Sequence, residues 1–426
     1  MLNYQIRKTP GDSEWFRTDR FGGFIHWGLY ALPARHEWVQ WKEKLSAEHY
    51  DRYFRHFDPD LFHPEDWAKQ MKAAGMKYVV LTAKHHEGFC MFDSAYTDFK
   101  VTNTAYGKDI VKECLDAFRK EGLRVGLYYS LIDWHHPHFT VDFNHPLYDA
   151  ERLEELNRDR DQSIYNAYMR DQVTELLTNY GKIDILWFDY SYEGKGAAEW
   201  EAEKLISTVR ALQPHILINN RTELEQDFWT PEQHQPLEWM RHPQTGELVT
   251  WEACQTLSGS WGYYRDEQTY KSPKMLIRLL IDQVALGGNL IMNVGPTAKG
   301  YFDKRASAAL RVYEEWMEYH SCSIYGCTQS EACFEAPMGT RLTQSVDGKR
   351  LYIHLLEYPF AFLEFPNLAS RIDYAQFLND GSEVEFSIEK AAYMHGTGAQ
   401  KAGNVIFSLP PIAPDVTVPV IEVLLK

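Results

Sequence analysis

Hydrophobic and polar positions follow two different periods along about the first 330 residues. Short apolar runs rich in β-branched and aromatic residues are typical of buried strands. Amphipathic stretches of helical period lie between these runs, so the pattern predicts a parallel sheet covered by helices. We expect strands at residues 22–27 (GGFIHW), 78–83 (YVVLTA), 124–129 (RVGLYY), 183–189 (IDILWFD), 215–220 (HILINN) and 289–294 (NLIMNV).

Start and stop residues mark the ends of two of the amphipathic stretches. The stretch 64–74 begins with Pro-Glu-Asp and stops at Gly75, which is a typical helix boundary pattern. The stretch 110–120 stops before Gly122 in the same way. We expect further helices at residues 163–180, 197–212, 274–286 and 306–319.

This alternation fits either a closed barrel or an open doubly wound sheet. No glycine-rich phosphate loop follows the first strand, which removes the main reason to choose a dinucleotide-binding sheet. A (β/α)8 barrel builds its active site from side chains at many strand ends. We therefore predict a (β/α)8-like (TIM) barrel in the α/β class, and leave its regularity open because not all eight strands are clear. Polar residues at the predicted strand ends are His26, His85, His86, Asp133, Asp189 and Arg221.

The pattern changes to period-two alternation after about residue 336. The alternating segments 350–355, 361–365, 383–388 and 416–425 are separated by Asp-Gly, Pro and Asn-Asp-Gly turns. This pattern is typical of an antiparallel β-sandwich. We expect two domains, a catalytic barrel over residues 1–335 and a β-sandwich over 336–426. The stretch 396–403 (GTGAQKAG) is expected to be a loop.

Composition excludes some classes of partner. The formal net charge is −16 and no basic run occurs, which argues against nucleic-acid binding. No apolar run is long enough to span a bilayer, and no secretory signal is evident, so we expect no membrane partner. The six cysteines lack paired CxxC spacing, which indicates reduced thiols and a cytoplasmic location. Aromatic residues make up 14% of the chain, a surplus that suits stacking on sugar rings.

An apolar strand that ends in a carboxylate is the strongest chemical signal. Burying an unpaired Asp189 would be costly, so a position at the rim of a barrel indicates catalysis. Glycoside hydrolysis needs a second carboxyl group as the acid/base. The residues alone do not select that partner, and the candidates are Glu223, Glu225, Asp227, Glu232, Glu238 and Glu252.

Histidines near the same strand ends allow two interpretations. His26 with His85 or His86, together with Asp189, could hold a metal ion in a metal-dependent hydrolase. Neutral imidazoles that bind sugar hydroxyls explain the same residues without an ion. Arg221 would keep a nearby catalytic carboxylate ionised, or it could form a structural ion pair.

Taken together, the motifs resemble glycoside hydrolase family 29, the α-L-fucosidases. The resemblance runs in order from about residue 14 to residue 330. It implies a (β/α)8-like barrel with a C-terminal β-sandwich, no cofactor and no metal. It is carried by RFGGFIHWG (20–28), EW (37–38), KHHEGF (84–89), GLYYS (126–130) with DW (133–134), WFD (187–189), WE (251–252) with GSWGY (259–263), and GGNL through NVGP (287–296).

The resemblance also implies roles for individual residues. Asp189 matches the nucleophile, and Glu232 matches the acid/base, with Glu252 and Glu238 as the positions to consider if Glu232 fails. The expected activity is exo-acting, retaining hydrolysis of terminal α-L-fucose from fucosylated oligosaccharides, with a related α-L-galactosidase or a metal-dependent hydrolase as alternatives. Homologues often form homo-oligomers, so we expect one here. Residues that match the fucose pocket are His26, Glu37, Trp38, His85, His86, Tyr129, Trp187, Arg221 and Trp261.

Overall fold

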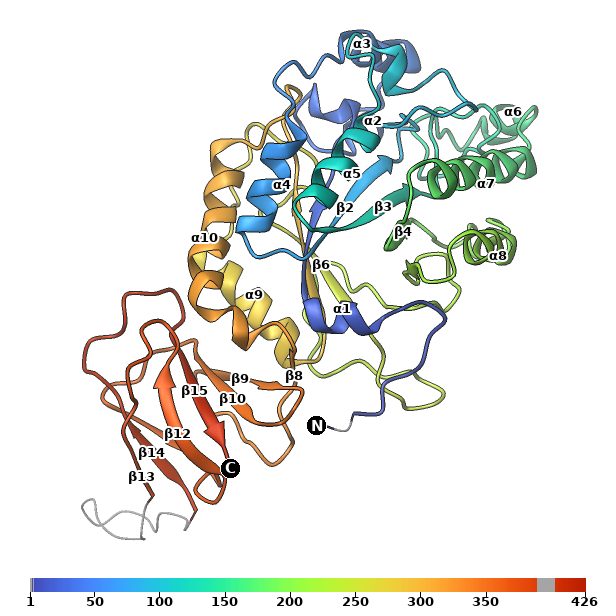
Figure 1. Cartoon of the computed structure of the whole chain (residues 1–426). Helices are drawn as coiled ribbons and strands as arrows, with labels where there is room; N and C mark the ends of the chain where they lie inside the picture. Colours follow the sequence, from blue (N-terminus) through green and yellow to red (C-terminus); the bar gives the residue numbers. More distant parts are fainter. Residues whose placement is uncertain (1, 3, 389–402) are drawn as a thin grey trace.

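The computed structural model describes residue 2, residues 4–388 and residues 403–426 (Figure 1). Most of the loop expected at 396–403 therefore lies outside the described residues. A seven-stranded parallel sheet in the order β5-β4-β3-β2-β1-β7-β6 forms the first part of the chain. Its strands are β1 (Phe21–Ile25), β2 (Tyr78–Lys84), β3 (Arg124–Ser130), β4 (Ile185–Asp189), β5 (Leu217–Ile218), β6 (Glu252–Thr256) and β7 (Asn289–Val294).

Helices surround the outside of this curled sheet, as Figure 1 shows for α4, α5, α7, α8, α9 and α10. The predicted helices form within a few residues of their expected bounds, and side-chain N-caps mark the starts of α5, α7, α9 and α10. Asp109, for example, accepts a hydrogen bond from the backbone of Lys112 at the start of α5. The helices are α1 (Glu14–Asp19), α2 (Val39–Lys42), α3 (Ala47–His56), α4 (Pro64–Ala73), α5 (Ile110–Lys120), α6 (Leu153–Asn157), α7 (Gln162–Asn179), α8 (Ala202–Leu212), α9 (Pro273–Ala285) and α10 (Lys304–His320), with short 3-10 turns at Leu29–Ala31, Val101–Asn103 and Ser321–Ser323.

The sheet has a gap between its two outer strands, β5 and β6, and an irregular segment, residues 227–233, lies in it. Parallel bridges join Asn219 to Phe228 on the β5 side and Glu232 to Cys254 on the β6 side. Backbone hydrogen bonds include one of 2.9 Å from Glu252 N to Trp229 O. The segment thus takes the place of an eighth strand, and the barrel prediction is confirmed in an irregular form.

The C-terminal part is built of two antiparallel sheets. A five-stranded sheet has the order β12-β15-β10-β9-β8, and a three-stranded sheet has the order β11-β14-β13. Leu351, Ile421, Phe365 and Phe407, from both sheets, share one apolar core, which makes the unit a sandwich. The strands are β8 (Cys327–Thr328), β9 (Thr340–Ser345), β10 (Arg350–Leu355), β11 (Phe362–Phe365), β12 (Ile372–Phe377), β13 (Phe386–Ile388), β14 (Val405–Ser408) and β15 (Val420–Leu425).

The sandwich packs against helices α9 and α10 (Figure 1). Trp316 on α10 donates a 3.1 Å hydrogen bond from Nε1 to the carbonyl of Val418. Arg341 on β9 donates to Asp282 on α9 at 2.8 Å. In the described part of the chain, no helix has the length and apolar character needed to cross a membrane.

Candidate active site

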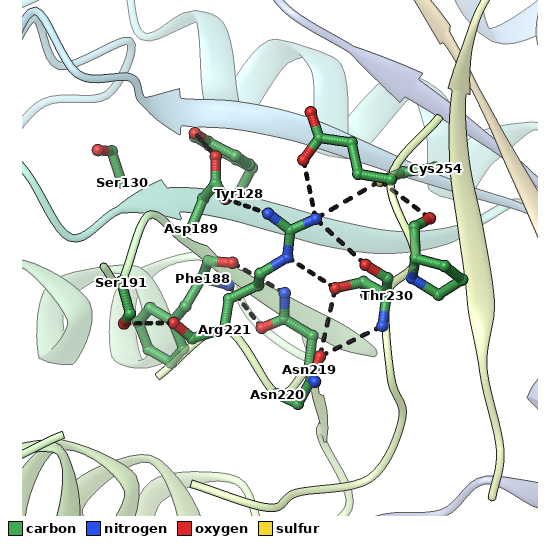
Figure 2. A network of polar contacts seen from close by, with 12 residues as sticks. Tyr128, Ser130, Phe188, Asp189, Ser191, Asn219, Asn220, Arg221, Thr230 and Cys254 are labelled. Carbon is green, nitrogen blue, oxygen red and sulfur yellow. Dashed lines mark hydrogen bonds and ion pairs between the residues drawn. The ribbon is translucent and has the colours of Figure 1, made fainter. Parts of the chain in front are cut away.

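Asp189 is the last residue of β4, at the carboxyl end of the parallel sheet. Tyr128 from β3 donates a 2.7 Å hydrogen bond to Oδ2, and Arg221 donates a 3.0 Å bond to Oδ1 (Figure 2). Burial raises the pKa of Asp189, the positive charge of Arg221 opposes that shift, and the negative charge of Glu232 adds to it. A desolvated but paired carboxylate of this kind has the properties of a nucleophile.

Glu232 lies near the end of the irregular segment 227–233, which holds it at the same rim. Its Oε2 accepts a 2.9 Å hydrogen bond from Nη2 of Arg221. One guanidinium therefore binds both candidate catalytic carboxylates, one on each nitrogen. The Glu232 side chain is 43% exposed, against 15% for Asp189. The more exposed group is thus the one that a leaving group and a water molecule can reach.

Arg221 itself is held rigidly. Its Nε donates to Thr230 Oγ1 at 2.8 Å, and Nη2 donates to the Thr230 carbonyl at 3.2 Å (Figure 2). The guanidinium also lies 5.0 Å from the ring centroid of Trp187, which adds a cation–π contact. These contacts fix the geometry in which the two carboxylates are presented.

The two reserve candidates for the acid/base lie elsewhere. Glu252 is the first residue of β6, and it accepts a hydrogen bond from Tyr78, the first residue of β2. Both lie at the opposite end of the barrel from Asp189, and burial raises the pKa of Glu252 to about 8. Glu238 is exposed and does not line the pocket. Neither is placed to act beside Asp189.

A pocket surrounds the two carboxylates and is lined by most of the residues expected in it. The pocket is lined by Phe24, His26, Glu37, Trp38, His85, His86, Tyr128, Trp187, Asp189, Tyr190, Arg221, Glu232, Cys254 and Trp261.

Ten of the predicted residues, both carboxylates included, therefore line this one pocket, and Tyr129 is the exception. Tyr129 lies outside the pocket because successive residues of a strand point to opposite faces. Tyr129 points outward, where its hydroxyl donates a 2.7 Å hydrogen bond to Gln172 on α7. Its neighbour Tyr128 points inward and contacts Asp189.

Sequence reasoning also missed Phe24, Tyr190 and Cys254, which line the pocket as well. Tyr128 on β3 pairs with Trp187 on β4, and Ser130 pairs with Asp189. Trp187 and Asp189 lie on the same face of β4, so this register identifies Tyr128 as the tyrosine that faces the pocket. Tyr190 follows Asp189 directly, but it has a positive φ of 82°, which the residue type does not suggest.

The histidines of the pocket are uncharged near neutral pH. Burial lowers the pKa of His26 to about 3, and it lowers the pKa values of His85 and His86 as well. His26 Nδ1 lies 2.6 Å from Asn293 Oδ1, and His86 Nδ1 lies 2.7 Å from Ser130 Oγ. A neutral imidazole held by one nitrogen presents the other as a single donor or acceptor. This arrangement suits the binding of hydroxyl groups.

Glu37 adds an acidic group to the pocket. It accepts hydrogen bonds from the backbone N–H groups of Trp261 (3.2 Å) and Gly262 (2.9 Å). Burial raises its pKa to about 7. Within the described residues, no group of three or more His, Cys, Asp or Glu side chains is arranged to hold a metal ion.

Comparison with known proteins identifies the family. The sequence model of the alpha-L-fucosidase family matches residues 3–321. The chain belongs to the alpha-L-fucosidase family of glycoside hydrolases. The human tissue alpha-L-fucosidase is 29% identical over 370 residues, which are 81% of this chain and 76% of that protein. The human plasma alpha-L-fucosidase is 30% identical over 344 residues, 73% of this chain and 68% of that protein.

Solved structures of fucosidases share the fold. Alpha-L-fucosidase isoenzyme 1 from Paenibacillus thiaminolyticus is 42% identical with a TM-score of 0.90, and the match covers 97% of this chain and 99% of that one. A family 29 enzyme from Bacteroides thetaiotaomicron, trapped as a covalent intermediate with 2-fluoro-fucosyl fluoride, is 27% identical with a TM-score of 0.82, over 100% of this chain and 98% of that one. The fucosidase fold thus extends over both domains.

Proposed function

We propose that this family member hydrolyses terminal α-L-fucosides with retention of configuration, through a fucosyl-enzyme intermediate. The observation that carries the proposal is the pairing of Asp189 and Glu232 on the single guanidinium of Arg221. Retaining hydrolysis needs two carboxyl groups close together, one as nucleophile and one as acid/base. The trapped covalent intermediate of the Bacteroides relative supports the same chemistry.

In the first step, Asp189 attacks the anomeric carbon while Glu232 donates its proton to the glycosidic oxygen. The bond to the leaving group breaks as the ester bond to Asp189 forms. In the second step, Glu232 removes a proton from water, the water oxygen attacks the anomeric carbon, and the ester bond breaks. Tyr128 and Arg221 hold Asp189 in position for both steps.

The rest of the pocket would bind the sugar ring. His26, His85, His86 and Glu37 supply hydrogen bonds to its hydroxyl groups, and Trp38 supplies an apolar face. Phe24, Trp187 and Trp261 belong to one apolar cluster, which suits a methyl group better than a hydroxymethyl group. This lining favours an α-L-fucoside over the α-L-galactoside, which carries an additional hydroxyl group at C6. Glycosides of the two sugars, compared by kcat/KM, separate these alternatives.

Azide rescue tests both carboxylates in one experiment with an aryl α-L-fucoside whose leaving group needs no proton. In Asp189→Ala, azide replaces the missing nucleophile and gives β-L-fucosyl azide by a single inversion. In Glu232→Ala, azide attacks the fucosyl-enzyme and gives α-L-fucosyl azide by two inversions. Both variants are expected to lose at least a hundredfold in kcat without azide.

Glu252→Ala and Glu238→Ala are the matched controls. The mechanism is refuted if Asp189→Ala stays inactive in azide although it folds normally. An α-azide from Glu252→Ala or Glu238→Ala, in place of Glu232→Ala, would move the acid/base to that residue. The predictions of a homo-oligomer and of a cytoplasmic location remain predictions. The finding that the six cysteines are free thiols agrees with a reducing compartment.

A further inference from the structure

Five aromatic side chains form a continuous surface that leads out of the pocket. We call Trp38, Trp41, Phe143, Tyr190 and Tyr192 the aromatic platform. They come from the segments that follow β1, β3 and β4. Neighbouring rings have centroids 5.0 Å (Trp38–Tyr190), 5.7 Å (Trp38–Trp41), 5.4 Å (Tyr190–Tyr192) and 5.4 Å (Tyr192–Phe143) apart.

The platform starts beside the catalytic carboxylates and ends at the surface. Trp38 and Tyr190 line the pocket together with Asp189 and Glu232. At the other end Phe143 is 51% exposed. A single exposed aromatic ring is ordinary, but apolar surface that continues unbroken from a pocket is typical of a ligand-binding groove.

The polar ends of these side chains are fixed by the segment after β3. Tyr192 donates to Asp142 at 2.6 Å, and Tyr190 donates to Asn144 at 3.3 Å. Trp41 Nε1 donates to the carbonyl of Phe143 at 3.2 Å. The rings are therefore held in place before any ligand arrives, and little conformational entropy is lost when a ligand stacks on them.

We propose that the outer part of the aromatic platform, Trp41, Phe143 and Tyr192, is the subsite for the sugar to which fucose is attached, and that Trp38 and Tyr190 join it to the fucose pocket. The ligand would be a pyranose that presents a face of axial C–H groups, such as a β-D-galactoside. This inference rests on the proposed function, because the fucose pocket must hold the non-reducing end for the next sugar to reach the platform. It predicts that an oligosaccharide is a better substrate than a fucoside without a leaving-group ring.

Two substrates separate the platform from the chemistry. A fucosylated trisaccharide reaches the platform, whereas the leaving group of α-L-fucosyl fluoride is a single atom and does not. In Phe143→Ala, the ratio of kcat/KM for the trisaccharide to kcat/KM for the fluoride should fall about tenfold, as expected for the loss of one ring contact. Phe143→Tyr keeps a ring and should restore most of the ratio.

Tyr192→Ala with Tyr192→Phe repeats the design at a second residue, in case Phe143→Ala does not fold. Phe360→Ala, an 85% exposed phenylalanine of the sandwich, is the matched control and should leave the ratio unchanged. An unchanged ratio in both alanine variants, or a ratio that falls equally in the control, overturns the proposal. A wild-type enzyme that hydrolyses neither substrate would instead contradict the proposed function.

Discussion

Arg221 is the residue on which the site depends most directly. It neutralises part of the charge that two carboxylates would otherwise place side by side in a partly buried pocket. In the proposed mechanism Asp189 must be ionised to attack, and the positive charge of Arg221 opposes the rise in its pKa that burial causes. The guanidinium therefore has an electrostatic role as well as a geometric one.

Replacing Arg221 should shift the acidic limb of the pH–activity profile. In Arg221→Gln the pKa of Asp189 rises further, so ionised enzyme appears only at higher pH and the acidic limb of kcat/KM moves upward. Arg221→Lys keeps the positive charge, but an ammonium group does not reproduce the contact of one guanidinium with both Asp189 and Glu232. This variant should lose about a hundredfold in kcat/KM, and its acidic limb should shift less than that of Arg221→Gln. The measurement is kcat/KM for an aryl fucoside, taken at intervals of about half a pH unit between about pH 4 and pH 8. An unshifted limb in the Gln variant would show that Arg221 does not control the ionisation of Asp189.

At the residue scale, the sequence indicates which side chains line the pocket where a local pattern carries the information. Asp189 stands out because a carboxylate ends an otherwise apolar strand. Whether Tyr128 or Tyr129 points inward depends on strand register, which requires the neighbouring strand. Glu232 could not be separated from other acidic residues, because its position comes from backbone pairing that has no period of its own.

At the scale of elements, the irregular segment 227–233 links the fold to the chemistry. Asp227 anchors its start: Oδ1 accepts from the backbone of Gly11 at 2.7 Å, and Oδ2 accepts from the backbone of Ile218 at 2.8 Å. Arg210 on α8 pairs with the same carboxylate at 2.5 Å. Caps and apolar runs predicted most of the strands and the helices α4, α5, α7, α8, α9 and α10, but not α1, α2, α3 and α6. They did not predict this segment, because tertiary hydrogen bonds hold it.

Asp227→Asn tests that anchor. The amide keeps the shape but loses the charge that pairs with Arg210, so the free energy of unfolding should fall by about 2–4 kcal/mol. Activity should fall as well, because the segment also carries Glu232. Urea unfolding measures the first effect and kcat the second. Asp266→Asn, which breaks an exposed pair with Arg265, is the control and should change neither. Equal stabilities of Asp227→Asn and wild type would mean that the segment is held by its other contacts.

At the scale of the whole molecule, the sandwich completes the apolar core of the barrel. Tyr352, Leu356, Val418 and Val420 from the sandwich belong to the same buried cluster as the barrel helices. The alternation after residue 336 predicted the sandwich itself. It could not predict this contact, because which face of a helix meets which sheet depends on both partners. The shared core favours unfolding of the two parts together.

Buried ionisable groups give the whole molecule a pH optimum of stability. Burial lowers the pKa of many histidines below 6.5, so stability is lost as the pH falls below that value and they gain protons on unfolding. Burial raises the pKa of Glu37 to about 7 and those of Glu87 and Glu252 to about 8. Their contribution is present below the unfolded pKa of about 4.5 and is lost as the pH rises toward 8. The histidines are His26, His36, His85, His86, His136, His145, His320 and His354.

The free energy of unfolding should therefore be greatest near pH 6.5 and should fall toward pH 8. Glu252 tests the falling side, because it lies away from the catalytic rim. In Glu252→Gln one proton-linked contribution disappears, so the slope between about pH 6.5 and 8 should become shallower by up to about 1.4 kcal/mol per pH unit. Urea unfolding at a series of pH values measures the slope, and Glu238→Gln, at an exposed position, is the control. Parallel curves for wild type and Glu252→Gln would show that Glu252 is already ionised in the folded protein, because only a carboxyl that keeps its proton on folding makes stability fall with rising pH.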